Sequence, residues 1–267
     1  MKKLLLSLFA LMVLMVACQK ADDIVALRTK AEKGDALAQA MMGDRCRDGI
    51  DVPKDIIEAI KWYTKAAEQG QAEAQANLGT FYMNGCGVDE NEATAFEWFH
   101  KSAEQGYALS QAKLGACYMN GRGVEKDMVK AVEWFQKAAE QGNAEAQGLL
   151  GDAYMKGDGV EKDEVKAVEW FTKSAKQGYG YAQMVLGMLY ADGKGVERDA
   201  EKAVEWTLKA VEQGNKYAQY SLGTFYATGS GVEKDDAKAI EWFKKAAEQG
   251  HEKASEVLKK LEGEVGE

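Results

Sequence analysis

The side chains that most often carry catalysis or bind metals are few in this chain and lie far apart. The two histidines, His100 and His251, fall in different parts of the sequence, and no cysteine or aspartate pattern joins them at the spacing of a zinc site. Gly-x-Ser-x-Gly and His-Glu-x-x-His motifs are missing from the sequence, and Ser-x-x-Lys occurs once, at Ser110 and Lys113 within an expected helix of the repeat described below. We therefore expect no catalytic centre, no metal and no cofactor.

Glycine-rich stretches could in principle bind phosphate. Gly-x-Gly occurs six times, but Gly-x-Gly-x-x-Gly does not, and each instance stands between two expected helices instead of after a strand. The three cysteines beyond the N-terminal segment, Cys46, Cys86 and Cys117, occupy different positions of the repeat described below. Helices pack about 8–10 Å apart, farther than the Cα spacing of about 4.4–6.8 Å in a disulfide. We therefore expect these three cysteines to be free thiols and not to form a disulfide within the chain.

The elements that position these residues are set by a strict repeat. Six tryptophans stand at positions 62, 98, 134, 170, 206 and 242, one every 36 residues. Glycines keep the same register, for example Gly43, Gly79 and Gly115, or Gly70, Gly106 and Gly142. Such a period is typical of a protein built from stacked copies of one small unit, which works by presenting a long surface.

Each unit is predicted to be a helical hairpin. In the third unit, residues 107–142, two stretches carry apolar residues three and four positions apart, as a helix with one buried face does. A Gly-Arg-Gly-Val turn separates them, and Asp127 follows where a short acceptor side chain would cap the second helix. The other units carry the same kind of residue there: Asp55, Asn91, Asp163, Asp199 and Asp235.

A hairpin of 36 residues cannot bury its own apolar face, so the units must stack and share one core. The sequence shows no alternation of apolar and polar residues, and we expect an all-α protein without a sheet. The predicted units are 35–70, 71–106, 107–142, 143–178, 179–214 and 215–250.

The pattern A-E-A-Q-x-x-L-G-x-x-Y-x-x-G-x-G-V-x-K-D-x-x-K-A-x-x-W-x-x-K-A-A-E-Q-G resembles the Sel1-like repeat, a relative of the tetratricopeptide repeat. The resemblance implies a right-handed α-solenoid whose first helices line the concave side. The first unit departs from the pattern at Met42, Cys46 and Asp51, as an end unit with one face in solvent does. We expect a half unit within 18–34 before it and a capping helix with its tail in 251–267.

The N-terminus is a different kind of sequence. Lys2 and Lys3 precede an apolar run that is too short to span a bilayer comfortably and that ends at Cys18. This resembles a lipoprotein signal, which implies cleavage after residue 17, a lipid on Cys18 and, with Gln19 next to it, sorting to the outer membrane. An ordinary secretory signal and an uncleaved anchor are the alternatives. We expect a lipid-anchored protein of the bacterial cell envelope.

The charge excludes one class of partner. The chain carries 34 Lys and Arg residues against 43 Asp and Glu, a formal net charge of −9 at pH 7. An acidic surface opposes binding to nucleic acid.

A partner surface is predicted on the first helices of the last two units. The third, seventh, tenth, eleventh and fourteenth positions of each unit vary, and at helical spacing they form one stripe. This stripe becomes apolar toward the C-terminus, which favours a groove for a peptide, helix or protein. Packing between neighbouring first helices is the alternative for the same residues. The candidate residues are Tyr181, Met188, Leu189, Tyr217 and Phe225.

The leading hypothesis is a non-catalytic scaffold that holds an envelope protein. A module for peptidoglycan or polysaccharide is the second hypothesis, since Tyr107, Tyr179, Tyr181, Tyr217 and Tyr220 could stack on sugar rings. The third is the penicillin-binding or β-lactamase activity of cysteine-rich Sel1-like proteins. The cysteines of that subfamily are replaced here, for instance by Ala67 and Gln75, so we expect no such activity.

Overall fold

The computed structural model describes residues 22–264, which contain helices and no strand. The predicted signal segment 1–17 and the predicted lipidation site Cys18 lie outside the described residues, as do residues 265–267. No described helix is long and apolar enough to cross a membrane. The hairpins predicted from the 36-residue spacing are present, and the all-α prediction is confirmed.

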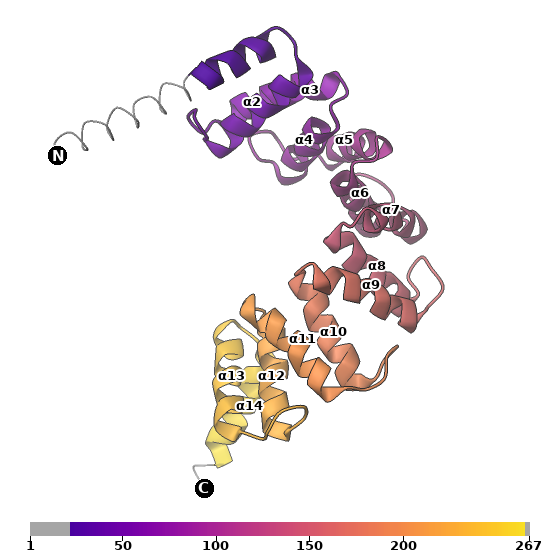
Figure 1. Cartoon of the computed structure of the whole chain (residues 1–267), viewed down its shortest axis with the longest axis vertical. Helices are drawn as coiled ribbons and strands as arrows, with labels where there is room; N and C mark the ends of the chain where they lie inside the picture. Colours follow the sequence, from indigo (N-terminus) through magenta and orange to yellow (C-terminus); the bar gives the residue numbers. More distant parts are fainter. Residues whose placement is uncertain (1–21, 265–267) are drawn as a thin grey trace, which may run out of the picture. The chain divides into compact units, whose positions relative to one another are not determined.

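The chain forms two compact units that divide after Asp127, and each is described by itself. Unit 1 contains the helical residues 22–32 and five further helices (Figure 1). They are α2 (Ala36–Asp48), α3 (Ile56–Glu68), α4 (Ala72–Asn84), α5 (Glu92–Glu104) and α6 (Ala108–Asn120). Unit 2 contains α7 (Met128–Glu140), α8 (Ala144–Lys156), α9 (Glu164–Lys176), α10 (Gly180–Asp192), α11 (Ala200–Glu212), α12 (Lys216–Thr228), α13 (Asp236–Glu248) and α14 (Glu252–Glu264).

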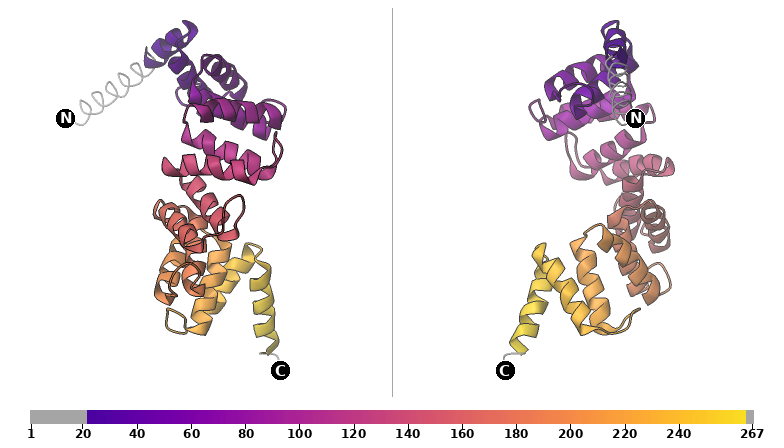
Figure 2. Two further views of the ribbon diagram at one scale, coloured as in Figure 1. Left: turned by 90° about the vertical axis from the view of Figure 1, so that its right-hand side faces the viewer. Right: turned by 60° about the vertical axis from the view of Figure 1, so that its left-hand side comes forward.

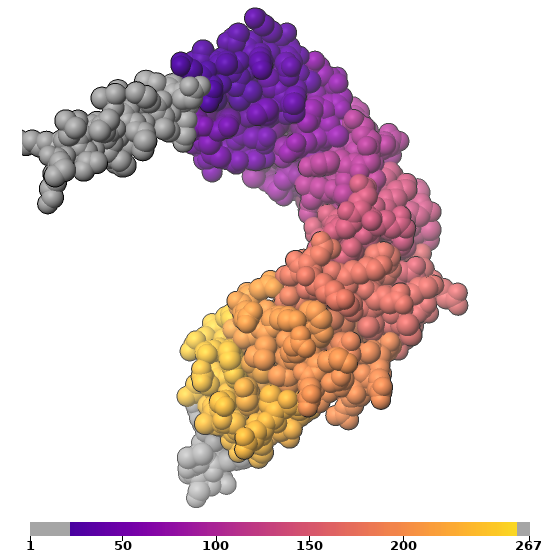
Figure 3. Space-filling view, viewed as in Figure 1, coloured from indigo at the N-terminus to yellow at the C-terminus, as the bar shows by residue number. Residues whose placement is uncertain are grey.

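Within each unit, consecutive helices pack on one another. The even-numbered helices α2 to α12 are the first helices of the six repeats, and α14 continues their series at the C-terminus. Figure 2 shows α14, in yellow, beside α13 at the end of unit 2, and the two helices are in contact. In the space-filling view the side chains fill the spaces between neighbouring helices of each unit (Figure 3).

The helix ends follow the capping rules. Asp163 has extended backbone, and its side chain accepts a hydrogen bond from the Lys166 N–H at 3.0 Å, which starts α9. Gly157 ends α8 in the left-handed conformation, with φ of 79°. The caps predicted at Asp55, Asn91, Asp199 and Asp235 are present in the same form.

Small residues let the two helices of a hairpin approach closely. A Cβ atom added to Gly151 in α8 would lie 3.0 Å from the ring of Phe171 in α9. Both Phe171 and the neighbouring Leu150 are fully buried. Repeat five differs, because Thr207 occupies the position of the aromatic ring, and it too is buried.

A ladder of glutamines sets the register between successive repeats. In unit 2, the buried Gln147 donates from Nε2 to the Ala139 carbonyl at 3.0 Å and accepts from Gln177 Nε2 at 2.8 Å. Gln183 and Gln213 form the same two hydrogen bonds one repeat later. Since a buried amide without partners is costly, these bonds favour one alignment of neighbouring repeats.

The tryptophans that reveal the repeat lie on the second helices. Each of the six carries the lysine three residues later over its ring: the Nζ atom lies 3.9 Å from the ring centroid for Lys137 and Trp134, and 3.8 Å for Lys173 and Trp170. Trp206 packs against the core cluster that contains Phe171. The tryptophans therefore cover the core and are themselves covered by charged side chains.

Candidate functional site

The structure divides the five residues of the predicted partner surface into two groups. Tyr181, Met188 and Tyr217 are exposed, with 38%, 49% and 55% of their surface accessible. Leu189 and Phe225 are buried, with 5% and 8% accessible. The exposed residues stand at the third and tenth positions of the repeat, whereas Leu189 and Phe225 both stand at the eleventh.

Leu189 and Phe225 each belong to a core cluster, which corrects the expectation that they line an open groove. Leu189 packs with Phe171 and Leu186, and Phe225 packs with residues of α11 and α12. The eleventh position points toward the second helix of the preceding repeat, which is α9 for Leu189 and α11 for Phe225. For these two residues packing is the correct interpretation.

An open groove lies in unit 2 where α12 approaches the start of α14. Its volume is about 540 Å³, within the range of roughly 300–1,000 Å³ that is common for ligand pockets. Met188 and Tyr217 line it, whereas Tyr181 does not. The other lining residues are Lys216, Tyr220, Ser221, Gly250, His251, Glu252 and Lys253.

His251 is the most constrained side chain of the groove. It is 7% exposed, and its Nδ1 accepts a hydrogen bond from the Ala254 N–H at 3.2 Å, which caps α14. Its ring stacks on Tyr220, with centroids 4.5 Å apart, and meets Tyr217 edge-on at 5.2 Å. Burial lowers the pKa of the imidazole below its usual value, and the nearby charge of Lys216 lowers it further. The neutral imidazole is therefore favoured.

Two positive side chains flank His251. Lys216 lies at the start of α12, and its Nζ donates to the Gln249 and Gly250 carbonyls at 3.3 and 3.4 Å. Lys253 belongs to the first turn of α14. Glu252 is the acidic residue beside them. The groove thus combines apolar surface with a mainly positive edge.

Tyr181 contacts an acidic residue instead of the groove. Its hydroxyl lies 2.9 Å from both carboxylate oxygens of Asp152 and donates to that group. Burial raises the pKa of Asp152, and the hydrogen bond from Tyr181 partly opposes this effect. Burial and the carboxylate also raise the pKa of Tyr181. Tyr181 is therefore partly fixed within unit 2.

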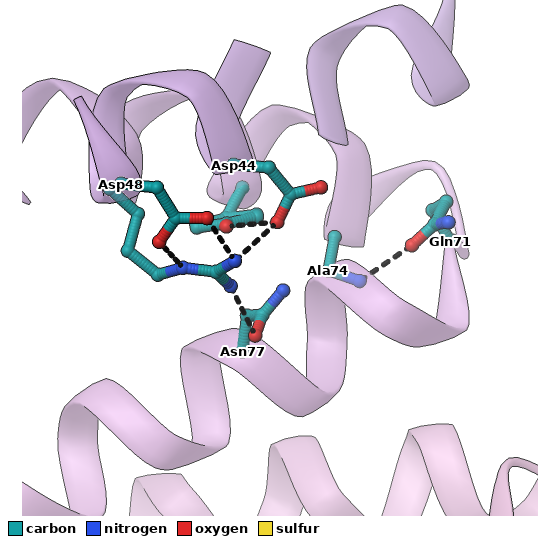
Figure 4. A network of polar contacts seen from close by, with 7 residues as sticks. Asp44, Asp48, Gln71, Ala74 and Asn77 are labelled. Carbon is teal, nitrogen blue, oxygen red and sulfur yellow. Dashed lines mark hydrogen bonds and ion pairs between the residues drawn. The ribbon is translucent and has the colours of Figure 1, made fainter. Parts of the chain in front are cut away.

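The equivalent face of unit 1 is closed by polar contacts. Figure 4 shows Asp44, Asp48 and Asn77 around one guanidinium group, that of Arg47. Arg47 lies 2.9 Å from Asp48, 3.2 Å from Asp44 and 3.3 Å from Asn77, in each case through a guanidinium nitrogen. Tyr63 donates from its hydroxyl to Asp44 at 2.7 Å. These groups satisfy one another.

A second hollow, of about 730 Å³, lies at the N-terminal end of unit 1. Ile24 and Leu27 line it from the helical residues 22–32, and Leu37 and Met41 line it from α2. Its charged groups include the ion pair of Arg45 with Asp51. Asp51 adopts a φ of 61° where the other repeats have glycine. Leu37 and Met41 occupy the third and seventh positions of the stripe.

The described residues contain three cysteine thiols. Cys46, Cys86 and Cys117 are free, and burial raises the pKa of Cys117 to about 11, so its thiol stays protonated near neutral pH. Within residues 22–264, no group of three His, Cys, Asp or Glu side chains could hold a metal ion.

Comparison with known proteins identifies the repeat. The Sel1 repeat matches six consecutive segments: residues 36–71, 72–107, 108–143, 144–179, 180–215 and 216–251. The chain belongs to the Sel1 repeat family. These segments start one residue later than the units drawn from the glycines. The predicted α-solenoid of six repeats is thereby confirmed.

Two solved structures of Sel1 repeat proteins are similar over most of the chain. One is a Sel1 repeat protein from Oxalobacter formigenes, 34% identical with a TM-score of 0.78, which covers 88% of this chain and 94% of that one. The other is a protective antigen present in uropathogenic Escherichia coli strains, 40% identical with a TM-score of 0.80 over 86% of this chain. This chain spans half the length of the E. coli protein. No curated protein matches the chain.

In the sequence, His251 was considered only as a possible metal ligand, and Lys216 and Lys253 were not singled out. His251 stands 36 residues after Asn215, so it occupies the first position of a seventh, incomplete repeat. Extension of the 36-residue period beyond the sixth repeat would have found His251 and also Lys253, which is equivalent to Tyr217 at the third position of the repeat. The stacking of His251 on Tyr220 carries no signal in the sequence.

Proposed function

We propose that this Sel1 repeat protein is a non-catalytic scaffold of the bacterial cell envelope, held there by a lipid on Cys18. We propose further that it binds a protein partner through the groove of unit 2. The observation that carries the proposal is the exposure of Tyr217 and Met188 beside an open groove. Exposed aromatic and apolar side chains that meet in a hollow favour a binding site.

The fold supports a role in binding. Sel1 repeats form a solenoid, an architecture that generally serves protein–protein interaction, and the described residues contain no metal cluster. The E. coli relative is described as a protective antigen, which favours an envelope location for this chain. The sequence around Cys18 supports a lipid anchor.

The anchor can be tested separately from the groove. Cells that produce the wild-type chain or Cys18→Ala would be fed a radioactive fatty acid and then fractionated. We expect label and membrane association for the wild type and loss of both in the variant. Equal partition of the two proteins, without label, would overturn the lipid anchor and leave the groove untouched.

The partner can be tested by crosslinking in intact envelopes followed by affinity purification. Wild type, Tyr217→Ala and Leu109→Ala would be compared after circular dichroism has shown that all three are folded. Leu109 is the matched control because it occupies the same position of the repeat in unit 1 and is 42% exposed. We expect a specific protein with wild type and Leu109→Ala and its loss with Tyr217→Ala.

Two other outcomes would overturn the scaffold. Recovery of cell-wall fragments instead of a protein would favour the glycan-binding alternative, for which Tyr217 is the exposed ring in the groove. Hydrolysis of the β-lactam nitrocefin by the purified chain would favour an enzyme. We expect neither result.

A further inference from the structure

The hollow at the N-terminal end of unit 1 has apolar side chains that are open to solvent. Leu37 is 62% exposed, Met41 41% and Ile50 49%. Ile24 and Leu27, on the helical residues 22–32, are half-buried against the neighbouring core and complete the apolar lining. We call these five residues the N-terminal apolar surface. Exposed apolar side chains that gather in one place mark a contact with a partner or a membrane.

No other repeat in the sequence is apolar at all three positions that Leu37, Met41 and Ile50 occupy. These are the third and seventh positions and the turn between the two helices. At the turn the later repeats carry Cys86, Arg122, Asp158, Lys194 and Ser230. A single exposed isoleucine would need no explanation, but Ile50 lines the same hollow as Leu37 and Met41. The combination is therefore a property of the N-terminal end and not of the repeat.

The length of the chain limits what can lie beside this surface. Asp22, the first described residue, stands four residues after Cys18, which carries the lipid in the proposed function. Four residues of fully extended chain span at most about 14 Å. A lipid on Cys18 therefore keeps the start of the helical residues 22–32 close to the membrane surface. Asp23 and Ile24 line the hollow at this point, so the hollow is held there too.

The charged groups of the hollow do not favour an anionic lipid surface. Arg45 and Asp51 form an ion pair, and the Asp35 carboxylate caps α2. Asp23 and Lys30 are the other charged residues of the lining. Together these residues give no excess of positive charge, which electrostatic attraction to anionic lipid requires. The apolar side chains are therefore the groups through which this end can contact lipid.

We propose that the N-terminal apolar surface docks on the membrane that holds the lipid anchor. Leu37, Met41 and Ile50 enter the boundary between lipid headgroups and acyl chains, roughly 5–10 Å deep, as the apolar face of an interfacial helix does. This contact fixes the orientation of unit 1 on the membrane, which a single point of attachment would not do. The inference rests on the proposed lipid anchor and adds a second contact between chain and membrane.

The test places a fluorescent NBD group on this surface in the full, lipidated chain. Leu37→Cys carries the dye, and Leu109→Cys is the matched control, since Leu109 has the same repeat position in unit 1 and is 42% exposed. Both proteins also carry Cys86→Ser, because Cys86 is exposed whereas Cys46 and Cys117 are buried. The proteins are reconstituted into phosphatidylcholine vesicles with and without a nitroxide label on the acyl chains.

We expect nitroxide-labelled lipid to lower the emission at position 37 about twofold or more, because a group at this depth meets the label directly. The emission at position 109 should change little. Equal quenching at the two positions, or none at position 37, would overturn the proposal. A dimer that shields position 37 without vesicles would assign the surface to a second copy and would also overturn it.

Two further changes separate apolar contact from mere closeness to the membrane. With the dye at Met41→Cys, the double variant Leu37→Ser/Ile50→Ser should lose about half of the quenching or more, whereas Leu109→Ser should lose none. The replaced side chains are exposed, so circular dichroism should show an unchanged fold. Unchanged quenching in the double variant would mean that the anchor alone brings this end to the membrane, which contradicts docking.

Failure of this inference can be told apart from failure of the anchor. If the wild-type chain takes up labelled fatty acid but position 37 is not quenched, the anchor stands and the docking is wrong. If no fatty acid is found on the chain, yet position 37 is quenched on added vesicles with and without Cys18→Ala, the docking stands and the lipid on Cys18 is wrong.

Discussion

The first helices of the two units present different chemistry at equivalent positions of one repeat. In unit 1, Arg47 joins Asp44, Asp48 and Asn77, so the polar groups bind one another. In unit 2, Met188 and Tyr217 are exposed beside the buried ring of His251. A repeat keeps its core fixed and can vary this face freely. The difference separates a face that stabilises the fold from one that is available for binding.

The largest loss of stability is expected for substitution of Tyr63, which connects the polar contacts around Arg47 to the core of unit 1. Tyr63 is fully buried and donates to Asp44. Tyr63→Ala should lower the free energy of unfolding by about 3–5 kcal/mol, as for other large core residues. Tyr217→Ala, on the exposed face of unit 2, should cost less than about 1 kcal/mol. Urea unfolding followed by circular dichroism measures both free energies. A similar loss of stability in the two variants would contradict the distinction between a stabilising face in unit 1 and an exposed face in unit 2.

The loop glycines sharpen the comparison between an end repeat and an inner one. Asp51 tolerates a positive φ in the first repeat, whereas a Cβ atom on Gly195 in unit 2 would lie 2.2 Å from the Glu164 carbonyl oxygen. Gly195→Ala should destabilise by about 2–4 kcal/mol, from overpacking together with strain. Gly178 is the control: its φ is +88° but a Cβ there would meet nothing within 4 Å.

Gly178→Ala should cost only the strain of the left-handed conformation, about 1–2 kcal/mol. Thermal unfolding of the two variants would show the difference. If Gly178→Ala were the more destabilising change, the close approach of the Gly195 loop to α9 would not be the reason that position 195 requires glycine.

A smaller effect distinguishes the two exposed tyrosines of unit 2. Tyr181→Phe removes the hydrogen bond to the half-buried Asp152 and should cost about 1–2 kcal/mol. Tyr217→Phe should change stability by less than about 0.5 kcal/mol, because no hydrogen bond of the Tyr217 hydroxyl is found within residues 22–264. Chemical unfolding of both variants tests the pair. Equal losses would mean that Tyr181 is no more fixed than Tyr217.

The smallest effect is a pH dependence of the C-terminal cap. Because the folded state lowers the pKa of His251, the unfolded chain takes up a proton at higher pH than the folded chain does. The contribution of His251 to stability is therefore complete above its ordinary pKa of about 6.5 and declines as the pH falls below it. His251→Asn should lose this part of the dependence.

The measurement is the midpoint of urea unfolding for wild type and His251→Asn between pH 8 and pH 5. As the pH falls, the urea midpoint of the wild type should decrease relative to that of His251→Asn. A difference that stays constant would show that His251 does not titrate as its surroundings indicate.

Much of the fold follows from the sequence because the repeat supplies six copies of each local signal. The caps at Asp163 and Asp235 and the turn at Gly157 are local and are present as predicted. The groove could be predicted only in part. Tyr217 and Leu189 share an apolar stripe in the sequence, but the rotation of the helix in its packed hairpin decides which of them is exposed. The contacts of His251 needed the structure, since they come from α12 and α14.

The central claim is that the groove of unit 2, and not the equivalent face of unit 1, binds a protein. A photoreactive phenylalanine analogue placed at Tyr217 or at Leu109 in the full chain tests it directly in living cells. We predict one discrete protein adduct at position 217, diminished when Met188→Ala is added, and none at position 109. An adduct of the same protein at both positions, or none at position 217, would contradict the claim.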